Sequence, residues 1–326
     1  MYILGIDLAK KTFDVTLLTP AGTRHHHTFP NTPTGFRDLW RWARAHGARS
    51  IRACMEATNV YWEALAQYLV EQGATVHVVN PARIKGYAQS QMLRNKTDKQ
   101  DSATIAAFCA AHDLAAWVPP TAAQRKLRAL VRHRDDLIAS RIQQTNRLED
   151  TTDPDVRASL EAVVATIASQ LLSIQQQITA HLHAHTELRE QHDLMDAVPG
   201  IGPVTAQKLV AEFYDLASYT SAKAVGADAG LTPANYESGT SVRRRPRLSK
   251  IGKASVRAAL YMPAITVMSR NTEFKAFAAR LAARGKSYGV ILGAVMRKLL
   301  HIIYGVVKHK APYDPRKVLG SAASTT

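Results

Sequence analysis

The chain has 326 residues, of which 46% are hydrophobic, and a formal net charge of +16. This length and composition exclude a disordered chain and allow two domains, or one domain with a helical appendage. Residues 1–237 hold 24 basic and 24 acidic residues, whereas residues 238–326 hold 18 basic residues and only two acidic ones. A field of one sign over one region favours nucleic acid as a partner, the alternative being a solvated basic face.

The sequence is expected to carry neither a targeting segment nor a disulfide framework. The N-terminus shows no basic segment before a small-residue cleavage site, so we expect no secretory signal. The longest apolar stretch, residues 287–307, is interrupted by Arg297, Lys298 and His301, so we expect no membrane helix. Cys54 and Cys109 lie within apolar patterns and cannot make a disulfide framework or a zinc knuckle. We therefore expect a cytoplasmic protein.

Strands and helices alternate up to about residue 118. The pattern predicts strands over residues 2–9, 12–20, 24–29, 50–58 and 75–81, and helices over residues 32–47, 59–73 and 96–112. Three consecutive strands followed by alternating helices and strands predict an α/β domain with a mixed sheet, over residues 1–118.

Long helices are predicted for residues 119–190. Apolar residues recur every three or four positions over 127–148 and 160–182, with a helix start at Asp153-Pro154 between them. Such a pattern fits an antiparallel hairpin within the chain and a coiled coil with another subunit equally well. Residues 191–326 are expected to be mostly helical around a loop-rich middle at residues 230–255.

Acidic residues occupy informative positions in the α/β part. Asp7 ends the first predicted strand and Glu56 lies near the end of a later one. Asp98 and Asp101 are three residues apart at the start of a predicted helix, so both face the same side. Four carboxylates that converge on one crevice would repel one another unless cations neutralised them, and oxygen ligands suit Mg²⁺ or Mn²⁺. A helix-terminal charge pair is the alternative for Asp98 and Asp101.

The opening ILGIDLAKK resembles the first strand of RuvC-type Holliday junction resolvases, in which a catalytic aspartate follows such a strand in a ribonuclease H-like fold. The order Asp, Glu and then a D-x-x-D pair on a late helix also resembles theirs. Sugar kinases of the actin-like superfamily begin similarly, but Ala9 and Lys10 stand where their small phosphate-binding residues are expected. His25-His26-His27 is interpreted as part of a solvated strand, because alternation sends neighbouring side chains to opposite faces.

Two glycines mark a turn in the sequence VPGIGPVTA. Gly200 and Gly202 permit a tight connection between helices, and the backbone N–H groups of the second helix can hold a phosphate. The turn is similar to a helix-hairpin-helix DNA-binding turn, with a purely structural connection as the alternative.

A basic cluster follows between residues 243 and 257. It contains no acidic residue and predicts contact with a phosphate backbone. Its members are Arg243, Arg244, Arg245, Arg247, Lys250, Lys253 and Arg257. Directly before it stands Glu237-Ser238-Gly239, which on residue type alone indicates a turn more than a nucleophile.

These motifs, in this order, resemble those of the DEDD transposases of bacterial insertion sequences, which are related to Piv-type DNA invertases. The resembling segments are GIDLAKKTFDV, KTDKQDSATIA, VPGIGPVTA and GLTP…SGT…LSKIGKASVRAAL. The resemblance implies a RuvC-like domain over residues 1–118, a helical linker over 119–190 and a transposase domain over 191–326. It also implies that Asp7, Glu56, Asp98 and Asp101 bind the metal and that Ser238 is the nucleophile.

The same resemblance implies partners. Members of this family work with a noncoding bridge RNA that pairs with donor and target DNA, which implies a ribonucleoprotein acting on two duplexes as a dimer or tetramer. In bacteria such a protein would act on the nucleoid. Two alternatives stay open at this point, namely a metal-dependent junction nuclease that uses water, and a nucleic-acid-binding protein without catalysis.

Overall fold

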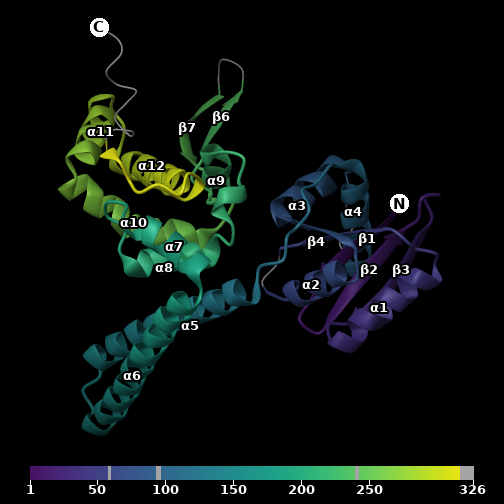
Figure 1. Cartoon of the computed structure of the whole chain (residues 1–326), viewed down its shortest axis with the longest axis horizontal. Coiled ribbons are helices and arrows are strands. Elements are labelled where there is room, and N and C mark those ends of the chain that lie inside the picture. Colours follow the sequence, from purple (N-terminus) through teal and green to yellow (C-terminus); the bar gives the residue numbers. More distant parts are fainter. Residues whose placement is uncertain (58–59, 93–96, 239–241, 316–326) are drawn as a thin grey trace. The chain divides into compact units, whose positions relative to one another are not determined.

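The computed structural model describes residues 1–57, 60–92, 97–238 and 242–315, and between residues 235 and 246 it describes the backbone alone. The chain divides into two compact units, Met1–Pro119 and Pro120–Thr326 (Figure 1). Each unit has its own apolar core, so each is described by itself.

The first unit is built on a five-stranded mixed sheet. Its strands are β1 (Tyr2–Leu8), β2 (Thr12–Leu18), β3 (Arg24–Pro30), β4 (Ile51–Glu56) and β5 (Thr75–Val79), in the order β3-β2-β1-β4-β5. The first three strands form an antiparallel meander, and β4 and β5 run parallel to β1. This arrangement confirms the mixed sheet predicted from the sequence.

Helices cover both faces of this sheet because its central strands are apolar on both sides. On one face Leu4, Ile6 and Phe13 pack against α1 (Pro33–Ala45) and α2 (Glu63–Glu71). On the other face Ile3 and Cys54 pack against α3 (Pro81–Ser90) and α4 (Asp98–Ala111). The sequence pattern did not predict α3, since only Ile84 of its residues is buried.

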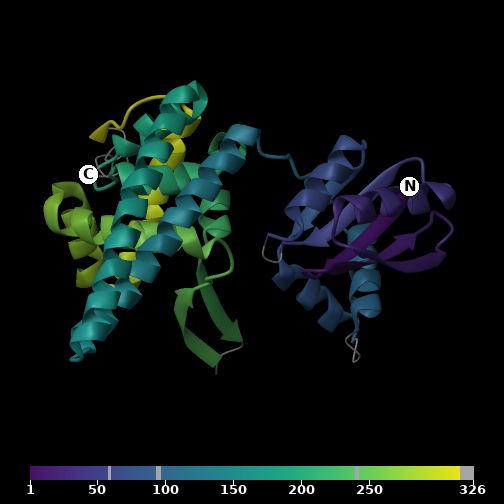
Figure 2. The same cartoon turned by 90° about the horizontal axis from the view of Figure 1, so that it is seen from below.

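The second unit begins with two long helices that lie side by side, α5 (Ala122–Asp150) and α6 (Pro154–Ala184) (Figure 2). Thr121 caps α5 in a reciprocal capping box with Gln124, and Asp153 caps α6 by accepting from two backbone N–H groups. The hairpin within one chain is therefore present. Several apolar side chains of its helices remain exposed, including Ile142, Val163 and Leu172.

The rest of the second unit is a helical bundle with one β-hairpin. Its helices are α7 (Thr186–Asp196), α8 (Pro203–Glu212), α9 (Ala222–Asp228), α10 (Ala254–Arg270), α11 (Thr272–Ala283) and α12 (Tyr288–Lys308), with a 3₁₀ turn at Leu216–Ser218. The hairpin consists of β6 (Pro233–Ser238) and β7 (Val242–Leu248), where the sequence predicted a loop. The loop prediction was wrong because neither segment has an apolar pattern typical of a strand, and β7 consists mainly of arginines. The pairing between the two strands is seen only in the structure.

Helix α12 forms the centre of the bundle, and most of its apolar residues belong to the core of this unit. Among the described residues, α6 and α12 are long and apolar enough to cross a membrane, by length and composition alone. Core helices of globular domains pass the same test, and 61% of the apolar window of α12 is buried inside the bundle.

Candidate active site and nucleic-acid interface

Two predicted site residues, Asp7 and Glu56, lie near the ends of neighbouring parallel strands. Ile6 of β1 is paired with Met55 of β4, so the next residue along each strand is one of the two acids. Because side chains alternate along a strand, Asp7 shares a face with Gly5, and Glu56 shares it with Cys54. This is the face that α4 covers, and both acids are half-buried there.

The other two predicted acids, Asp98 and Asp101, lie in the first turn of α4. Thr97 caps this helix, its side chain accepting from the backbone N–H of Gln100. Asp98 is exposed and Asp101 is half-buried. Acids in this turn also stabilise the helix through its dipole, so the position by itself fits both the metal-binding and the structural interpretation.

Contacts with the sheet fix where α4 crosses it. Ser102 forms a buried hydrogen bond of 2.8 Å between its hydroxyl and that of Thr16 on β2. Further along the helix, Cys109 lies in the same apolar cluster as Cys54 on β4. The helix therefore runs across β2, β1 and β4, and its first turn lies on the β2 side of the face. Thr16 is paired with Gly5, two residues before Asp7 on β1, whereas Glu56 lies on β4, on the other side of β1.

A glycine in the first strand makes this crossing possible. A Cβ atom placed on Gly5 would lie 2.2 Å from the backbone N of Ala106 and 2.2 Å from the backbone O of Ser102. No real side chain tolerates such distances, so α4 lies directly on the β1 backbone only because residue 5 lacks a Cβ. Gly5 thereby sets the height of Asp101 above the sheet.

The donor set suits a hard divalent cation, because all four predicted ligands are carboxylates. Among the residues that the structure describes, no group of three or more His, Cys, Asp or Glu side chains is arranged to hold a metal ion. The four acids come from three elements, β1, β4 and the first turn of α4.

One acid in this region was not singled out from the sequence. Asp14 is paired with Asp7 across β1 and β2, and its side chain is 15% exposed. Its Oδ1 accepts from the Thr28 hydroxyl at 2.7 Å and lies 3.0 Å from His26 Nε2. Asp14 is thus held by β3, and His26 has a structural partner. The only sequence signal for this acid was its place in the segment TFDV.

Ser238 is the last described residue of β6, and its backbone is paired with that of Val242. The hairpin that carries it projects from the helices of the second unit, as the views in Figures 1 and 2 agree. Residues 239–241 lie outside the described residues, as do the side chains of Ser238, Arg243, Arg244 and Arg245. The backbone register places these three arginines on β7, opposite the strand that ends in Ser238.

The base of this hairpin is held by two members of the predicted basic cluster. Lys253 Nζ lies 2.6 Å from Asp228 Oδ2, and the Tyr219 hydroxyl donates to the same oxygen at 2.6 Å. Burial and the Asp228 carboxylate raise the pKa of Tyr219, so this hydroxyl stays protonated. Arg257 donates to the backbone carbonyls of Ala229 and Gly252 at 3.0 and 3.2 Å.

The remaining cations of the cluster are placed differently. The charged groups of Lys253 and Arg257 are engaged within the protein, whereas Arg247 and Lys250 are exposed to solvent. Arg247 and Lys250 are therefore the described members of the cluster that a phosphate backbone reaches without breaking an internal contact.

The two glycines of the predicted phosphate-binding turn have different surroundings. Gly200 has a φ of +79°, and a Cβ there would lie 2.3 Å from Val267 Cγ1 of α10, so this glycine is required by packing. Gly202 is the N-cap of α8, and a Cβ there would meet open space. If the turn contacts a phosphate, the contact is therefore expected at Gly202 and the first turn of α8, and not at Gly200.

Comparisons with known proteins define the class. A DEDD transposase model of the IS110 type, described as "Transposase", matches residues 4–153. A second model, "Transposase IS116/IS110/IS902 family", matches residues 192–279. The chain is therefore a DNA recombinase of the transposase class, an enzyme that acts on DNA.

Relatives extend this match over almost the whole chain. The pilin gene-inverting protein of Moraxella lacunata is 33% identical over 316 residues, which cover 96% of this chain and 98% of the relative. A probable family 20 transposase of Pseudomonas aeruginosa is 22% identical over 96% of this chain and 98% of its own length. The transposase of IS1328 of Yersinia enterocolitica is 24% identical over 63% of this chain and 68% of its own length.

The chain belongs to the DEDD transposase family of bacterial insertion sequences. Membership confirms the family resemblance found in the sequence and implies DNA as the substrate. The family name, which refers to four acidic residues, also suggests that activity depends on a divalent metal.

Proposed function

We infer that this protein is an insertion-sequence transposase that cuts and exchanges DNA strands through a covalent phosphoserine. The observation that carries the proposal is the position of Asp7 and Glu56 on neighbouring parallel strands, beneath the helix that begins with Asp98 and Asp101. These four carboxylates would hold Mg²⁺, for which Mn²⁺ can substitute. When bound, the ion supplies Lewis-acid stabilisation of the charge that develops on the scissile phosphate.

Ser238 supplies the nucleophile in this proposal. Its Oγ attacks phosphorus, so that the Oγ–P bond forms as the P–O3′ bond breaks and the serine proton passes to the departing 3′ oxygen. The 3′-hydroxyl of the partner duplex then attacks the phosphoserine and regenerates the serine. The number of phosphodiester bonds is conserved, so no ATP is needed. The position of Ser238 at the end of a projecting hairpin supports this role, because such a serine can reach a duplex.

The unit organisation supports a division of labour. We assign residues 1–118 to a ribonuclease H-like, RuvC-like metal-dependent domain, residues 119–190 to a helical linker, and residues 191–326 to the serine-bearing transposase domain. The mixed sheet with helices on both faces supports the first assignment. Gly200 shapes the turn before α8, while Gly202, Arg247 and Lys250 would contact phosphates. Arg243, Arg244 and Arg245 join them by their position on β7.

The proposed partners are donor and target duplexes and a noncoding bridge RNA that pairs with both. The charge excess of residues 238–326 supports a polyanionic partner, and the family resemblance supports the RNA. We further propose a dimer that assembles into a tetramer, acting on nucleoid DNA in the bacterial cytoplasm. Exposed apolar side chains on the α5–α6 hairpin, such as Val163 and Leu172, support contact with a second copy.

Covalent trapping on a nicked suicide DNA substrate tests the mechanism. The wild-type protein is expected to form a protein–DNA adduct in Mg²⁺, and mass spectrometry should locate the phosphate on Ser238. Ser238→Ala should abolish the adduct, whereas Ser249→Ala, eleven residues further along the same segment, should leave it intact. Asp7→Asn and Asp98→Asn should each lower the rate of cleavage by about a hundredfold or more.

Two results would replace the proposal. Cleavage at the normal rate by Ser238→Ala would identify a metal-dependent junction nuclease that uses water. Full activity of Asp7→Ala and Asp98→Ala proteins would leave a nucleic-acid-binding protein whose acids are structural.

A further inference from the structure

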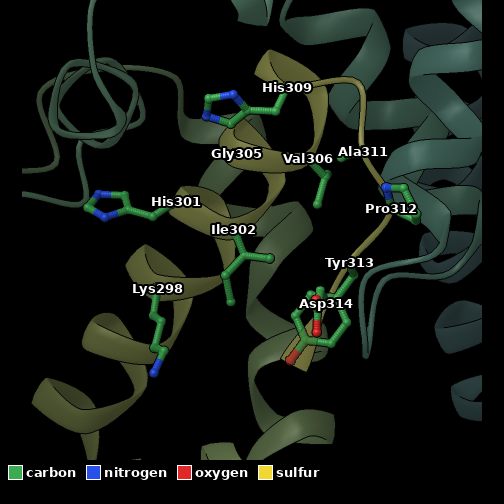
Figure 3. Close-up of a pocket in the computed structure, with 10 residues that line it drawn as sticks. All are labelled: Lys298, His301, Ile302, Gly305, Val306, His309, Ala311, Pro312, Tyr313 and Asp314. Atoms are coloured by element: carbon green, nitrogen blue, oxygen red, sulfur yellow. The ribbon is translucent and has the colours of Figure 1, made fainter. Parts of the chain in front are cut away.

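A pocket lies between the C-terminal half of α12 and the segment that follows it (Figure 3). Its volume is about 390 Å³, within the range of pockets that take small organic ligands. Lys298 and His301 lie along α12 and His309 is its C-cap, while Tyr313 and Asp314 come from the following segment (Figure 3). None of the residues that line it belongs to the site proposed above.

The middle of the pocket is lined by apolar residues. Ile302 and Val306 line it from α12, one turn apart, and Pro312 lines it from the opposite segment. Between them lies Gly305, where an added Cβ would meet no atom within 4 Å. The absence of a side chain at residue 305 therefore leaves the pocket open at its middle.

A lysine in an unusual environment stands at one end. The Nζ of Lys298 lies 4.7 Å from the ring centre of Phe277 and 5.7 Å from that of Phe274. No carboxylate of the described residues lies within ion-pair distance of this ammonium group. Burial lowers the pKa of Lys298 and the nearby Arg280 lowers it further, while the Glu273 carboxylate acts in the opposite direction. A cation that is partly desolvated and faces aromatic rings is stabilised by an anion from outside.

The charges around this end are predominantly positive. The guanidinium of Arg297 lies 3.5 Å from His301 Nε2, and together with burial it lowers the pKa of His301. His301 is therefore neutral near pH 7 and able to hydrogen-bond an uncharged group. Of the two acids nearby, Glu273 accepts from the Tyr313 hydroxyl at 3.0 Å, and Asp314 lines the pocket near Tyr313.

We propose that this pocket binds one nucleotide of a single-stranded nucleic acid, with the base between Ile302 and Tyr313 and its phosphate beside Lys298. A flat apolar base suits the aliphatic walls and the tyrosine ring, and a phosphate completes the charge balance of Lys298. Neutral His301 is placed to hydrogen-bond a base or ribose edge. The excess of basic residues in this part of the chain favours a strand over a free nucleotide. The choice of nucleic acid as the ligand rests on the proposed function.

Photocrosslinking of the full-length protein to short oligonucleotides tests the assignment. The probes are a 4-thiouridine RNA and a 4-thiothymidine DNA of mixed sequence, and the readout is the crosslinked peptide that contains Tyr313. The protein carries Ser238→Ala, so that no covalent adduct at the serine competes with the crosslink. The proposal predicts a crosslink at Tyr313, which unlabelled oligonucleotide competes away and AMP does not.

Two variants and two matched controls make the test specific. Gly305→Leu fills the pocket without strain and Lys298→Met removes the charge, and each should weaken the Tyr313 crosslink by about tenfold or more. Gly289→Leu is the same change in the same helix, at a site that is also open but lies outside the pocket. Lys275→Met removes an exposed lysine of α11. Both controls should stay within about twofold of the parent protein.

The assignment is wrong if Gly305→Leu and Gly289→Leu crosslink equally well at Tyr313, or if the crosslinks map only to other segments. Competition by AMP at the same concentration as the oligonucleotide would contradict the choice of a strand. If the Tyr313 crosslink fails while the wild-type protein still forms the phosphoserine adduct, only the nucleotide-binding pocket is wrong. If the crosslink forms while the wild-type protein makes no adduct at Ser238, only the proposed mechanism is wrong.

Discussion

Gly5 is the residue on which the candidate metal site depends most directly. Since a Cβ at this position would lie 2.2 Å from two backbone atoms of α4, Gly5→Ala must push the helix away from β1. We expect a loss of about 1–3 kcal/mol in the free energy of unfolding, as for overpacking, together with a weaker affinity for Mn²⁺. Thermal unfolding and calorimetric Mn²⁺ titration measure the two effects.

A matched control separates the site from the fold. Gly86 lies within α3 of the same unit, and a Cβ there would meet open space, so Gly86→Ala should be neutral or slightly stabilising. Normal Mn²⁺ affinity in the Gly5→Ala protein would show that the height of α4 does not control the acids. In that case Asp98 and Asp101 would be better explained as first-turn charges that stabilise α4 through its dipole.

Single residues also show where sequence reasoning reaches its limit. The neighbouring positions of Asp7 and Glu56 could be predicted from the sequence, because strand ends converge at one edge of a sheet, whereas their role as metal ligands stays a prediction. Lys253 was predicted to contact phosphate, but its partner Asp228 stands 25 positions earlier in the chain, so only the folded structure reveals this ion pair. Asp14 was missed for a similar reason, since its proximity to Asp7 depends on the register of β1 and β2.

At the scale of elements, strong periodicity was a reliable guide and weak periodicity was not. The central strands and the helices α5 and α6 carry apolar residues at regular positions, and the sequence predicted each of these elements. Helix α3 buries a single residue, and β7 carries mainly arginines, so neither has an apolar pattern to detect. Such elements form because of what they contact, which is information that a local pattern does not contain.

The junction of α5, α6 and α8 contains a buried polar network that sets their packing. Arg134 of α5 is 3% exposed and hydrogen-bonds Gln207 of α8 and, at 3.2 Å, Gln175 of α6. Gln207→Leu removes the main acceptor of a buried guanidinium, so the free energy of unfolding should fall by about 1–3 kcal/mol. Urea unfolding measures the loss, and Gln176→Leu, an exposed glutamine of α6, should change little.

The double variant gives the decisive comparison for this network. Arg134→Met with Gln207→Leu replaces the polar pair by apolar side chains, so most of the stability lost in Gln207→Leu should return. A double variant as unstable as the single one would show that the loss comes from altered packing at residue 207 and not from the acceptor that Arg134 has lost.

At the scale of the whole molecule, the two units have separate cores joined by a short segment. The buried apolar clusters of the first unit lie within residues 3–114, and that of the second lies within residues 127–307. Trp117 still belongs to the first unit, because its backbone N–H donates to the backbone carbonyl of Val76 at 2.7 Å and its ring packs against that of Trp62. Thr121 already caps α5. The division between the units therefore falls at residues 118–120.

This separation leads to a prediction about fragments and salt. Fragments 1–119 and 120–326 should each fold, as circular dichroism and cooperative unfolding would show, and DNA binding should reside in the second.

The logarithm of the DNA-binding constant of fragment 120–326 should fall with the logarithm of salt concentration by about 0.9 for each phosphate contact. Arg247→Gln and Lys250→Gln should each reduce this slope by about one contact, because both side chains are exposed. Lys253→Gln should instead lower stability and leave the slope unchanged, since its ammonium group pairs with Asp228. Equal slopes for the two fragments would show that the basic C-terminal segment is a solvated face and not the DNA-binding surface.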